Sequence, residues 1–225
     1  MTGFLHTKLF SPTLPILIRN PEPTDAAALS RILSNPANIG LDKSANALSV
    51  SDAEVAISRM RESAAEAVPT RVNFVVELLS GTTAPKSGEE KDGEEEGDEN
   101  GNGNGNGNVI GLSGFGGIDV DPADGKRFAD VGAMIDPEYR GRGFALEAVR
   151  LSIDFAFGVL KVDGVTAHTL EANVAMVGLL DRKLGWKAEK KEEMAGADAG
   201  AGVVEVECVY RMSESEWRLM RERLV

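Results

Sequence analysis

The chain has 225 residues, a length that suits one sizeable domain and is short for two. Its 36 acidic side chains against 24 basic ones repel nucleic-acid phosphates and the anionic membrane leaflet and attract protonated amines, so we expect neither a nucleic-acid nor a membrane partner. A single cysteine, Cys208, excludes an intrachain disulfide, and with only two histidines the supply of metal ligands is poor, so we expect no metal site.

The sequence also favours a cytoplasmic location and leaves the nucleus open. Pro12 and Pro15 interrupt the first twenty residues, so we expect no secretory signal. No run approaches the ~18 apolar residues that a membrane span requires, and a lone cysteine suits a reducing compartment. Nothing in the sequence indicates the oligomeric state.

The first predicted elements are a short strand at 16–19 and an alanine-rich helix at 25–33. Ser51, with Glu54 three residues later, predicts a capping box for a second helix that ends at about Arg61. The chain therefore opens in the order β-α-α.

Residues 81–108 are acidic and rich in glycine and asparagine, with no aromatic or branched aliphatic side chain before the end of the segment. Such a segment buries too little apolar surface to offset the entropy lost on ordering, so we predict a disordered insertion. Its flanks, 71–79 and 108–117, are both typical of strands, and an antiparallel pair tolerates a long loop. We therefore predict one domain, 1–225, interrupted at about 81–108. The alternative role of the segment is an acidic arm for a basic partner.

The second half is predicted to alternate strands and helices. Strands are expected at 128–136, 164–170 and 203–210, helices at 143–160 and 174–184, and a Gly-rich hairpin at 195–202. Ser213 and Glu216 predict a capping box for a last amphipathic helix. Hairpins in the first half and helical crossovers in the second indicate a mixed α/β fold.

The run from Tyr139 to Ala145 lies between a predicted strand and a predicted helix. Gly141 and Gly143 allow successive main-chain N–H groups to face outward together, and such groups at a helix N-terminus bind phosphate. Arg140 and Arg142 add positive charge at the same place. Spacing alone leaves open a basic glycine turn that only caps a helix. A P-loop and a dinucleotide fingerprint are excluded, because neither Gly-Lys-Ser/Thr nor Gly-x-Gly-x-x-Gly occurs here.

Arg140-x-x-Gly143-x-Ala145 resembles the acetyl-CoA pyrophosphate motif of the GNAT superfamily, Gln/Arg-x-x-Gly-x-Gly/Ala. The resemblance continues downstream, where Asn173 opens a helix that Lys183-Leu-Gly-Trp186 closes, and it covers nearly the whole chain outside the insertion. The N-terminal region, with Arg19 and then Asp25, is similar to the branch that acetylates ribosomal-protein N-termini.

The resemblance implies a central mixed, mostly antiparallel twisted sheet of about seven strands flanked by helices. It also implies an N-acetyltransferase that moves an acetyl group from acetyl-CoA to a primary amine of a protein, peptide or small molecule. The acceptor stays open among peptide N-termini, lysine side chains, polyamines and small amines, because the expected substrate loops, 35–50 and 195–202, lack a diagnostic motif.

Two departures from the family pattern, Met176 and a missing tyrosine, support an alternative function. Met176 stands where relatives carry a polar residue, and one extra residue separates Asn173 from Gly185. The helix that Asn173 opens also lacks the tyrosine that often acts as the family's acid. The alternative is a catalytically weak or inactive acyl-CoA-binding module with an acidic partner-docking arm.

The resemblance assigns cofactor contacts to a strand, a loop and a helix start. They are the main chain of Met134 and Ile135 for the pantetheine arm, the run Arg140, Gly141, Arg142, Gly143, Phe144 and Ala145 for the pyrophosphate, and the Asn173 side chain.

Acetyl transfer requires a neutral amine, so the candidate catalytic residues include a proton acceptor. Asp130 is the first candidate, because similar proteins carry an acidic residue there and strand alternation places it on one face with Met134. Glu171 is the second candidate, and Asn173 is a third catalytic candidate that is also a good helix N-cap. A surface carboxylate or salt-bridge partner is the alternative for Asp130. His168, which alternates with apolar residues, is expected to be structural.

Overall fold

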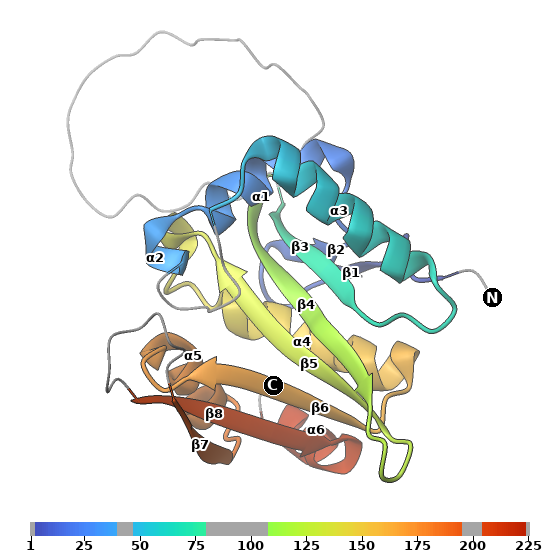
Figure 1. The fold of residues 1–225 in the computed structure, drawn as a ribbon, viewed down its shortest axis with the longest axis vertical. Coiled ribbons are helices and arrows are strands. Elements are labelled where there is room, and N and C mark those ends of the chain that lie inside the picture. The colour runs from blue at the N-terminus through green and yellow to red at the C-terminus, as the bar shows by residue number, and fades with distance from the viewer. Residues whose placement is uncertain (1–2, 40–46, 80–107, 195–203, 224–225) are drawn as a thin grey trace, which may run out of the picture.

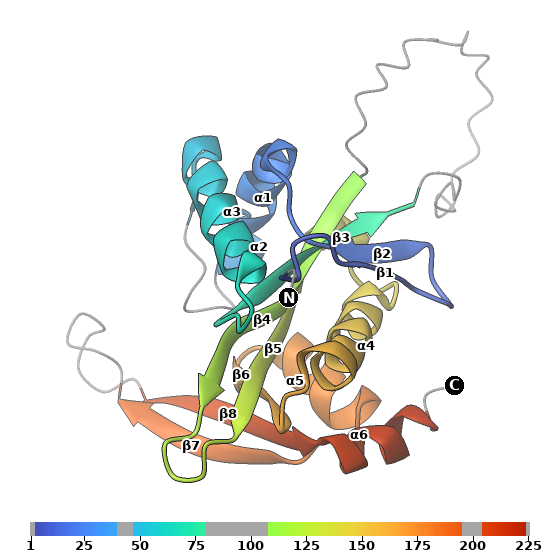
Figure 2. The same ribbon diagram turned by 90° about the vertical axis from the view of Figure 1, so that its right-hand side faces the viewer.

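The computed structural model describes residues 3–39, 47–79, 108–194 and 204–223. The predicted insertion therefore lies outside the described residues, except for its last residue, as does the predicted hairpin turn at 195–202. The described residues form one continuous sheet with helices on both faces (Figures 1 and 2).

The sheet has eight strands in the described part of the chain, in the order β1-β2-β3-β4-β5-β6-β8-β7. Their bounds are β1 Lys8–Phe10, β2 Ile16–Arg19, β3 Val72–Leu78, β4 Asn108–Val120, β5 Arg127–Ile135, β6 Gly164–Leu170, β7 Ala188–Met194 and β8 Val204–Ser213. Every neighbouring pair is antiparallel except β5 and β6. The expectation of about seven strands missed β1, a three-residue edge strand too short to show a periodicity of its own.

The helices cover both faces of the sheet. They are α1 Ala26–Leu33, α2 Pro36–Ile39, α3 Val50–Ala65, α4 Phe144–Phe155, α5 Val174–Gly178 and α6 Glu214–Arg221. Figure 2 shows α1 and α3 on one face, called the outer face below, and α4 on the opposite face. The alternation along β3 explains this arrangement, because Phe74 packs into the larger core with α4 and Val75 into the smaller core with α1 and α3.

One predicted cap was misplaced. The capping box of α3 pairs Ser49 with Asp52, whose N–H donates to the Ser49 hydroxyl at 3.1 Å, and the helix runs on to Ala65. Two overlapping Ser-x-x-acid patterns occur here, and the sequence alone did not show which of them begins the helix. The predicted box of Ser213 and Glu216 is confirmed.

The two predicted long helices of the second half each end in a wider π turn. The turn Ala156–Leu160 follows α4, and the turn Leu179–Lys183 follows α5. In the second turn the Leu184 N–H donates to the Leu179 carbonyl at 3.0 Å, a bond that spans five residues. A π turn accommodates one additional residue.

The two strands that flank the insertion are paired as predicted. Leu78 lies opposite Asn108 at the end of the antiparallel pair β3–β4, so the insertion leaves and re-enters the sheet at adjacent positions. We expect replacement of residues 80–107 by a four-residue turn to change the melting temperature by less than about 3 °C, because the sequence of the segment offers no aromatic or branched aliphatic side chain to a core. Acetyl-CoA affinity should also stay within about twofold. Calorimetry of the shortened and full chains tests this, and a drop of about 10 °C would show that the insertion packs.

Candidate active site

The parallel strands β5 and β6 separate along their length and open a wedge in the sheet. Their pairing covers only three positions and ends where Asp130 lies opposite Thr166. Beyond that point a cavity of about 760 Å³ lies between 133–135 of β5, the segment 139–146 and the segment 173–183. This volume lies in the range of cofactor and small-molecule sites.

The glycine loop lines the cavity. Gly141 and Gly143 line it, with φ of 78° and 83°, a left-handed conformation that only glycine adopts without strain. A Cβ atom placed on Gly141 would meet nothing within 4 Å. The first N–H groups of α4, which starts at Phe144, have no acceptor inside the helix. The loop and the helix start therefore offer main-chain donors beside an open space.

The two loop arginines are used differently from the sequence expectation. The Arg140 guanidinium lies at the cavity wall but donates to the carbonyls of Ile135 and Ala37, each at 3.2 Å, and to Oδ1 of Asn38. Arg142 donates to the Glu138 carbonyl at 3.3 Å and lies over the Tyr139 ring. In this structure both side chains therefore bind protein groups.

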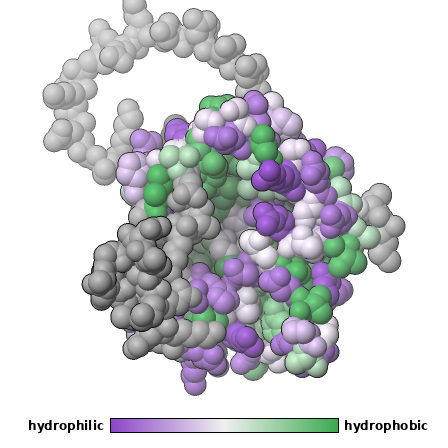
Figure 3. All heavy atoms as spheres, viewed as in Figure 1, coloured by the Kyte–Doolittle hydropathy of each residue, from purple (hydrophilic) through white to green (hydrophobic). Residues whose placement is uncertain are grey.

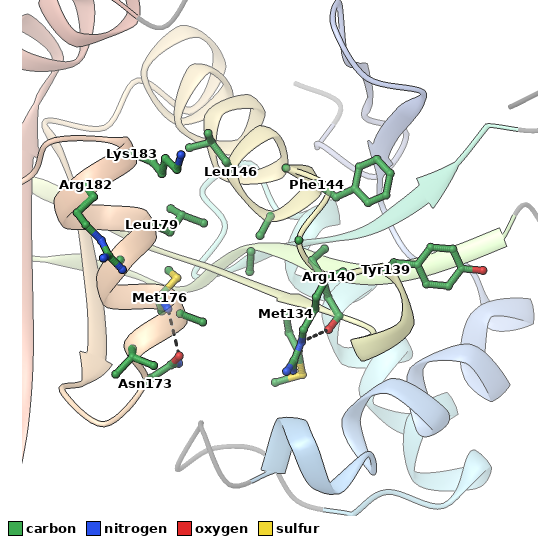
Figure 4. Close-up of a pocket in the computed structure, with 18 of the residues that line it drawn as sticks. Met134, Tyr139, Arg140, Phe144, Leu146, Asn173, Met176, Leu179, Arg182 and Lys183 are labelled. Atoms are coloured by element: carbon green, nitrogen blue, oxygen red, sulfur yellow. Dashed lines mark hydrogen bonds between the residues drawn. The ribbon is translucent and has the colours of Figure 1, made fainter. Parts of the chain in front are cut away.

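Two cations of the cavity wall were missed by the sequence analysis. Arg182 and Lys183 lie across the cavity from the glycine loop (Figure 4). The Arg182 guanidinium packs over Gly178, where a Cβ atom would lie 2.4 Å from Nη2. Both residues belong to the π turn after α5, and a regular helix would rotate them to other positions. The only sequence feature that pointed to these two residues was the Lys-Leu-Gly-Trp end of the helix, which Arg182 precedes and Lys183 begins.

Asn173 opens α5, and its side chain accepts a hydrogen bond from the Met176 N–H at 3.1 Å. The N-cap role is therefore confirmed. Figure 4 shows Asn173 and Met176 on one side of the cavity and Met134 and Arg140 on the other. The Tyr139 hydroxyl points away from the cavity and accepts from Asn108 Nδ2 at 2.8 Å.

Asp130 lies at the apex of the wedge, on the outer face of the sheet. Oδ1 is 3.4 Å from the Thr166 hydroxyl. Burial raises the pKa of Asp130 to about 6, against the opposing effect of the His168 imidazole and the Thr166 hydroxyl. The carboxylates of Asp119 and Glu207 raise the pKa further. A carboxyl group with this pKa is ionised at neutral pH yet basic enough to accept a proton.

Glu171 does not join Asp130. It follows β6 five residues beyond Thr166, which places it about 16 Å along the strand from the position opposite Asp130. The structure thus separates the two candidate bases along the wedge, with only Asp130 at its apex.

His168, the histidine expected to be structural, lies at the surface of the sheet beside β8. The strand alternation turns Ala167 into the core and His168 outward, where it is exposed on the outer face shared with Asp130. His168 Nδ1 lies 3.6 Å from Oε1 of Glu207.

Arg19 and Asp25, the two residues on which the resemblance of the N-terminal region rests, form a buried ion pair. Arg19 donates two hydrogen bonds to Asp25, at 2.7 and 2.9 Å, and one to Glu77 at 2.6 Å. These residues join β2, β3 and the start of α1, so their role here is structural.

In residues 3–39, 47–79, 108–194 and 204–223, no group of three or more His, Cys, Asp or Glu is placed to hold a metal ion. In the same ranges no helix has the length and apolar character needed to cross a bilayer.

A family model for the acetyltransferase (GNAT) domain matches residues 16–187, more than half of the chain. The chain belongs to the GNAT acetyltransferase family. The match covers β2 to the end of the π turn after α5, so it includes the glycine loop, the wedge and both walls of the cavity.

Solved structures share the GNAT fold over nearly the whole chain. RimJ of Mycobacterium smegmatis in complex with CoA-disulfide is 18% identical, covers 94% of this chain and 88% of its own, and has a TM-score of 0.66. A ribosomal-protein-S5-alanine acetyltransferase of Vibrio fischeri is 16% identical, with 94% and 98% coverage and a TM-score of 0.66. Spermidine N-acetyltransferase of Vibrio cholerae, in complex with CoA and spermine, is 17% identical, with 91% and 98% coverage and a TM-score of 0.65. The fold is therefore equally similar to proteins with different acceptors.

Proposed function

We propose that this GNAT domain transfers the acetyl group of acetyl-CoA to a primary amine, with the cavity between β5 and β6 as its active site. The observation that carries the proposal is the position of the glycine loop. Its two left-handed glycines and the start of α4 lie at the mouth of a wedge whose apex holds a carboxylate with a raised pKa. Acetyl-CoA is a co-substrate, and none of the proposed steps requires a metal.

The pyrophosphate would lie on the main-chain N–H groups of the run from Gly141 to Ala145, because these donors combine with the α4 dipole. Arg182 and Lys183 supply positive charge on the opposite wall, which suits the phosphates of the same molecule. The Arg140 side chain is already occupied by protein carbonyls, so we assign this residue's contribution to the pyrophosphate to its main chain.

The register of β4 and β5 favours particular main-chain groups for the pantetheine arm. The Asp136 N–H donates to the Ile110 carbonyl at 2.8 Å, so alternation directs the main chain of Met134 toward β4. The main-chain groups of Ala133 and Ile135 then face the wedge. We propose that the main-chain groups of Ala133 and the N–H of Ile135, whose carbonyl accepts from Arg140, pair with the pantetheine amides and that Met134 contributes its side chain to the wall.

The chemistry requires a neutral amine to attack the thioester carbonyl. Asp130 would accept the ammonium proton, directly or through water, and the amine lone pair would form the bond to the carbonyl carbon. The tetrahedral intermediate then loses its second nitrogen proton, to water or to the departing sulfur, as it collapses to the amide and the carbon–sulfur bond breaks. A thiol pKa near ~8.5 means that the leaving thiolate needs little help from an acid, which fits a site without an asparagine-helix tyrosine. Alignment of amine and thioester supplies much of the rate.

An acetyl-CoA consumption screen tests the function. The four amine classes to compare are peptide N-termini, lysine side chains, polyamines and small amines, each followed by release of free thiol. We expect release above the rate without amine for one class. Tight acetyl-CoA binding with no amine-dependent release would instead support the acyl-CoA-binding module.

Arg182 provides a test of the cavity wall. We expect Arg182→Ala to weaken acetyl-CoA binding about tenfold, because a charge beside the phosphates is lost. The effect should shrink at high salt, since screening reduces the same interaction. Calorimetric titration at two salt concentrations measures it, with Arg218→Ala on exposed α6 as the control. Equal affinities for Arg182→Ala and the wild type at low salt would remove Arg182 from the site.

A further inference from the structure

Two arginines connect the β5–α4 turn with the α1–α2 segment from opposite directions. Arg31 of α1 donates to the buried Asp136 carboxylate and, at 3.2 Å, to the Val109 carbonyl. Arg140 of the loop donates in the other direction, to Ala37 and Asn38 of α2. The turn that leads into the glycine loop is thus bound to α1 and α2 at two points.

Asn38 is the centre of the second contact. It is buried, with 2% of its surface exposed, although its neighbours Pro36 and Ala37 are exposed. Its Nδ2 donates to the Ile32 carbonyl at 2.8 Å, and its Oδ1 accepts from Arg140. A buried amide keeps its place only when its donors and acceptors are satisfied. Asn38 therefore couples the end of α1 to the Arg140 guanidinium.

The geometry of Arg140 suits a connector. Its Nε donates to the Ile135 carbonyl at the end of β5, and its Nη2 donates to the Ala37 carbonyl, so one planar group spans two separate segments. A lysine has a single charged nitrogen and cannot reproduce this fork. All three acceptors are neutral oxygens, so the contact depends on geometry more than on charge.

We propose that Arg140 is a positioning residue, whose guanidinium fastens α2 to the β5–α4 turn and so sets the cavity wall that Asn38 forms. We call this contact the Arg140–Asn38 clasp. One consequence of the clasp, its effect on the acceptor, rests on the proposed function. Helix α2 belongs to the segment 35–50 expected to contact the acceptor, and it continues from α1 on the outer face that also carries Asp130 (Figure 1). The loop proposed to bind the pyrophosphate therefore also holds α2 in place through the clasp. In this way it positions the acceptor side of the site.

The space-filling view supports this position for the acceptor side. Figure 3 shows the outer face hollowed between the helices α1 and α3 and the strands β6 and β8. A Cβ atom placed on Gly132, between Asp130 and Met134 on this face, would meet nothing within 4 Å. The hollow thus extends to β5, and α2 lies beside it.

The test compares Arg140→Lys, Asn38→Ala and the double variant with the wild type. The first measurement is amide exchange in α2, where the N–H groups of Asn38 and Ile39 donate to the Asn35 carbonyl at 2.8 and 3.1 Å. We expect about tenfold faster exchange of these amides in Arg140→Lys, because local opening is easier without the clasp. Arg61→Lys is the matched control, since Arg61 of α3 also donates to a carbonyl, that of Pro21. It should leave the exchange of α2 unchanged.

The second measurement distinguishes an effect on the acceptor from an effect on acetyl-CoA. We expect Arg140→Lys to raise the acceptor KM about tenfold while the acetyl-CoA Kd stays within about threefold. The double variant should be no worse than the more affected single variant, because both changes break one contact.

Unchanged α2 exchange in Arg140→Lys would overturn the clasp, and so would a weakened acetyl-CoA Kd with an unchanged acceptor KM. If no amine is acetylated by the wild type, the proposed function fails, and the exchange measurement still decides the clasp.

Discussion

Asp130→Asn should lower the rate of acetyl transfer at neutral pH by ~10²–10⁴, the usual contribution of a positioned proton acceptor. Asparagine keeps the size of the side chain and can still bind the Thr166 hydroxyl, but it cannot take the ammonium proton. The acetyl-CoA Kd should hardly change, because Asp130 does not line the cavity around the glycine loop. Steady-state kinetics with saturating acetyl-CoA, together with calorimetric titration, measure both effects.

The pKa of Asp130 also predicts the direction in which pH should change the rate. The pKa of Asp130 is raised to about 6, so the wild-type rate should rise as pH passes through that value and the base becomes ionised. The variant should lack this rise. Its deficit should also shrink at higher pH, where the amine loses its proton without help.

Ionisation of Asp130 should lower the stability of the fold, although it raises the rate. The pKa of Asp130 in the folded state lies above the value of about 3.9 in an unfolded chain, so ionising this carboxyl destabilises the fold. Loss of stability develops as pH rises through the window from about 4 to 6. Asp130→Asn should therefore increase the free energy of unfolding at pH 7, on the order of 2 kcal/mol, and have little effect near pH 4. Urea unfolding at the two pH values checks the difference.

Glu171→Gln is the control for the base. If it shows the loss of rate and Asp130→Asn does not, Glu171 is the proton acceptor. If neither change alters the rate more than a few-fold, alignment of the substrates carries the reaction and both assignments fail.

Gly143→Val should raise the acetyl-CoA Kd about a hundredfold, since a β-branched residue resists the left-handed conformation and turns the loop N–H groups away from the phosphates. The fold should survive, because a Cβ atom at Gly143 would contact only Leu14 Cδ1, at an ordinary 3.6 Å. Calorimetric titration of the folded variant gives the Kd.

Gly125→Val is the matched control for Gly143→Val. Gly125 has a similar φ of 73°, and a Cβ atom there would meet nothing within 4 Å, but it lies in the β4–β5 turn outside the cavity. It introduces similar backbone strain, which costs about 1–3 kcal/mol, and should leave acetyl-CoA affinity unchanged. An unchanged Kd in a folded Gly143→Val would contradict the phosphate-loop assignment.

Much of the architecture followed from local patterns. The alternation along β5 predicted that Asp130 and Met134 share one face of the sheet, since each strand residue projects opposite to the next. The glycine loop was predicted for a similarly local reason. Gly141 and Gly143 adopt left-handed conformations that their own lack of a Cβ permits, and a helix start always leaves unbonded N–H groups. The family itself could be inferred from this run.

The arrangement of the cavity was decided by the tertiary structure. The Arg140 guanidinium donates to Ala37 and Asn38 of α2, which lie about a hundred residues away in the sequence. No local pattern could therefore show what it binds. Arg182 and Lys183 reach the cavity only because a π turn rotates them, and the placement of His168 beside Glu207 depends on the pairing of β6 with β8. A residue's backbone conformation and the face it occupies depend on its neighbours in the chain, whereas the partner of a long polar side chain depends on which distant segments the sheet brings within its reach.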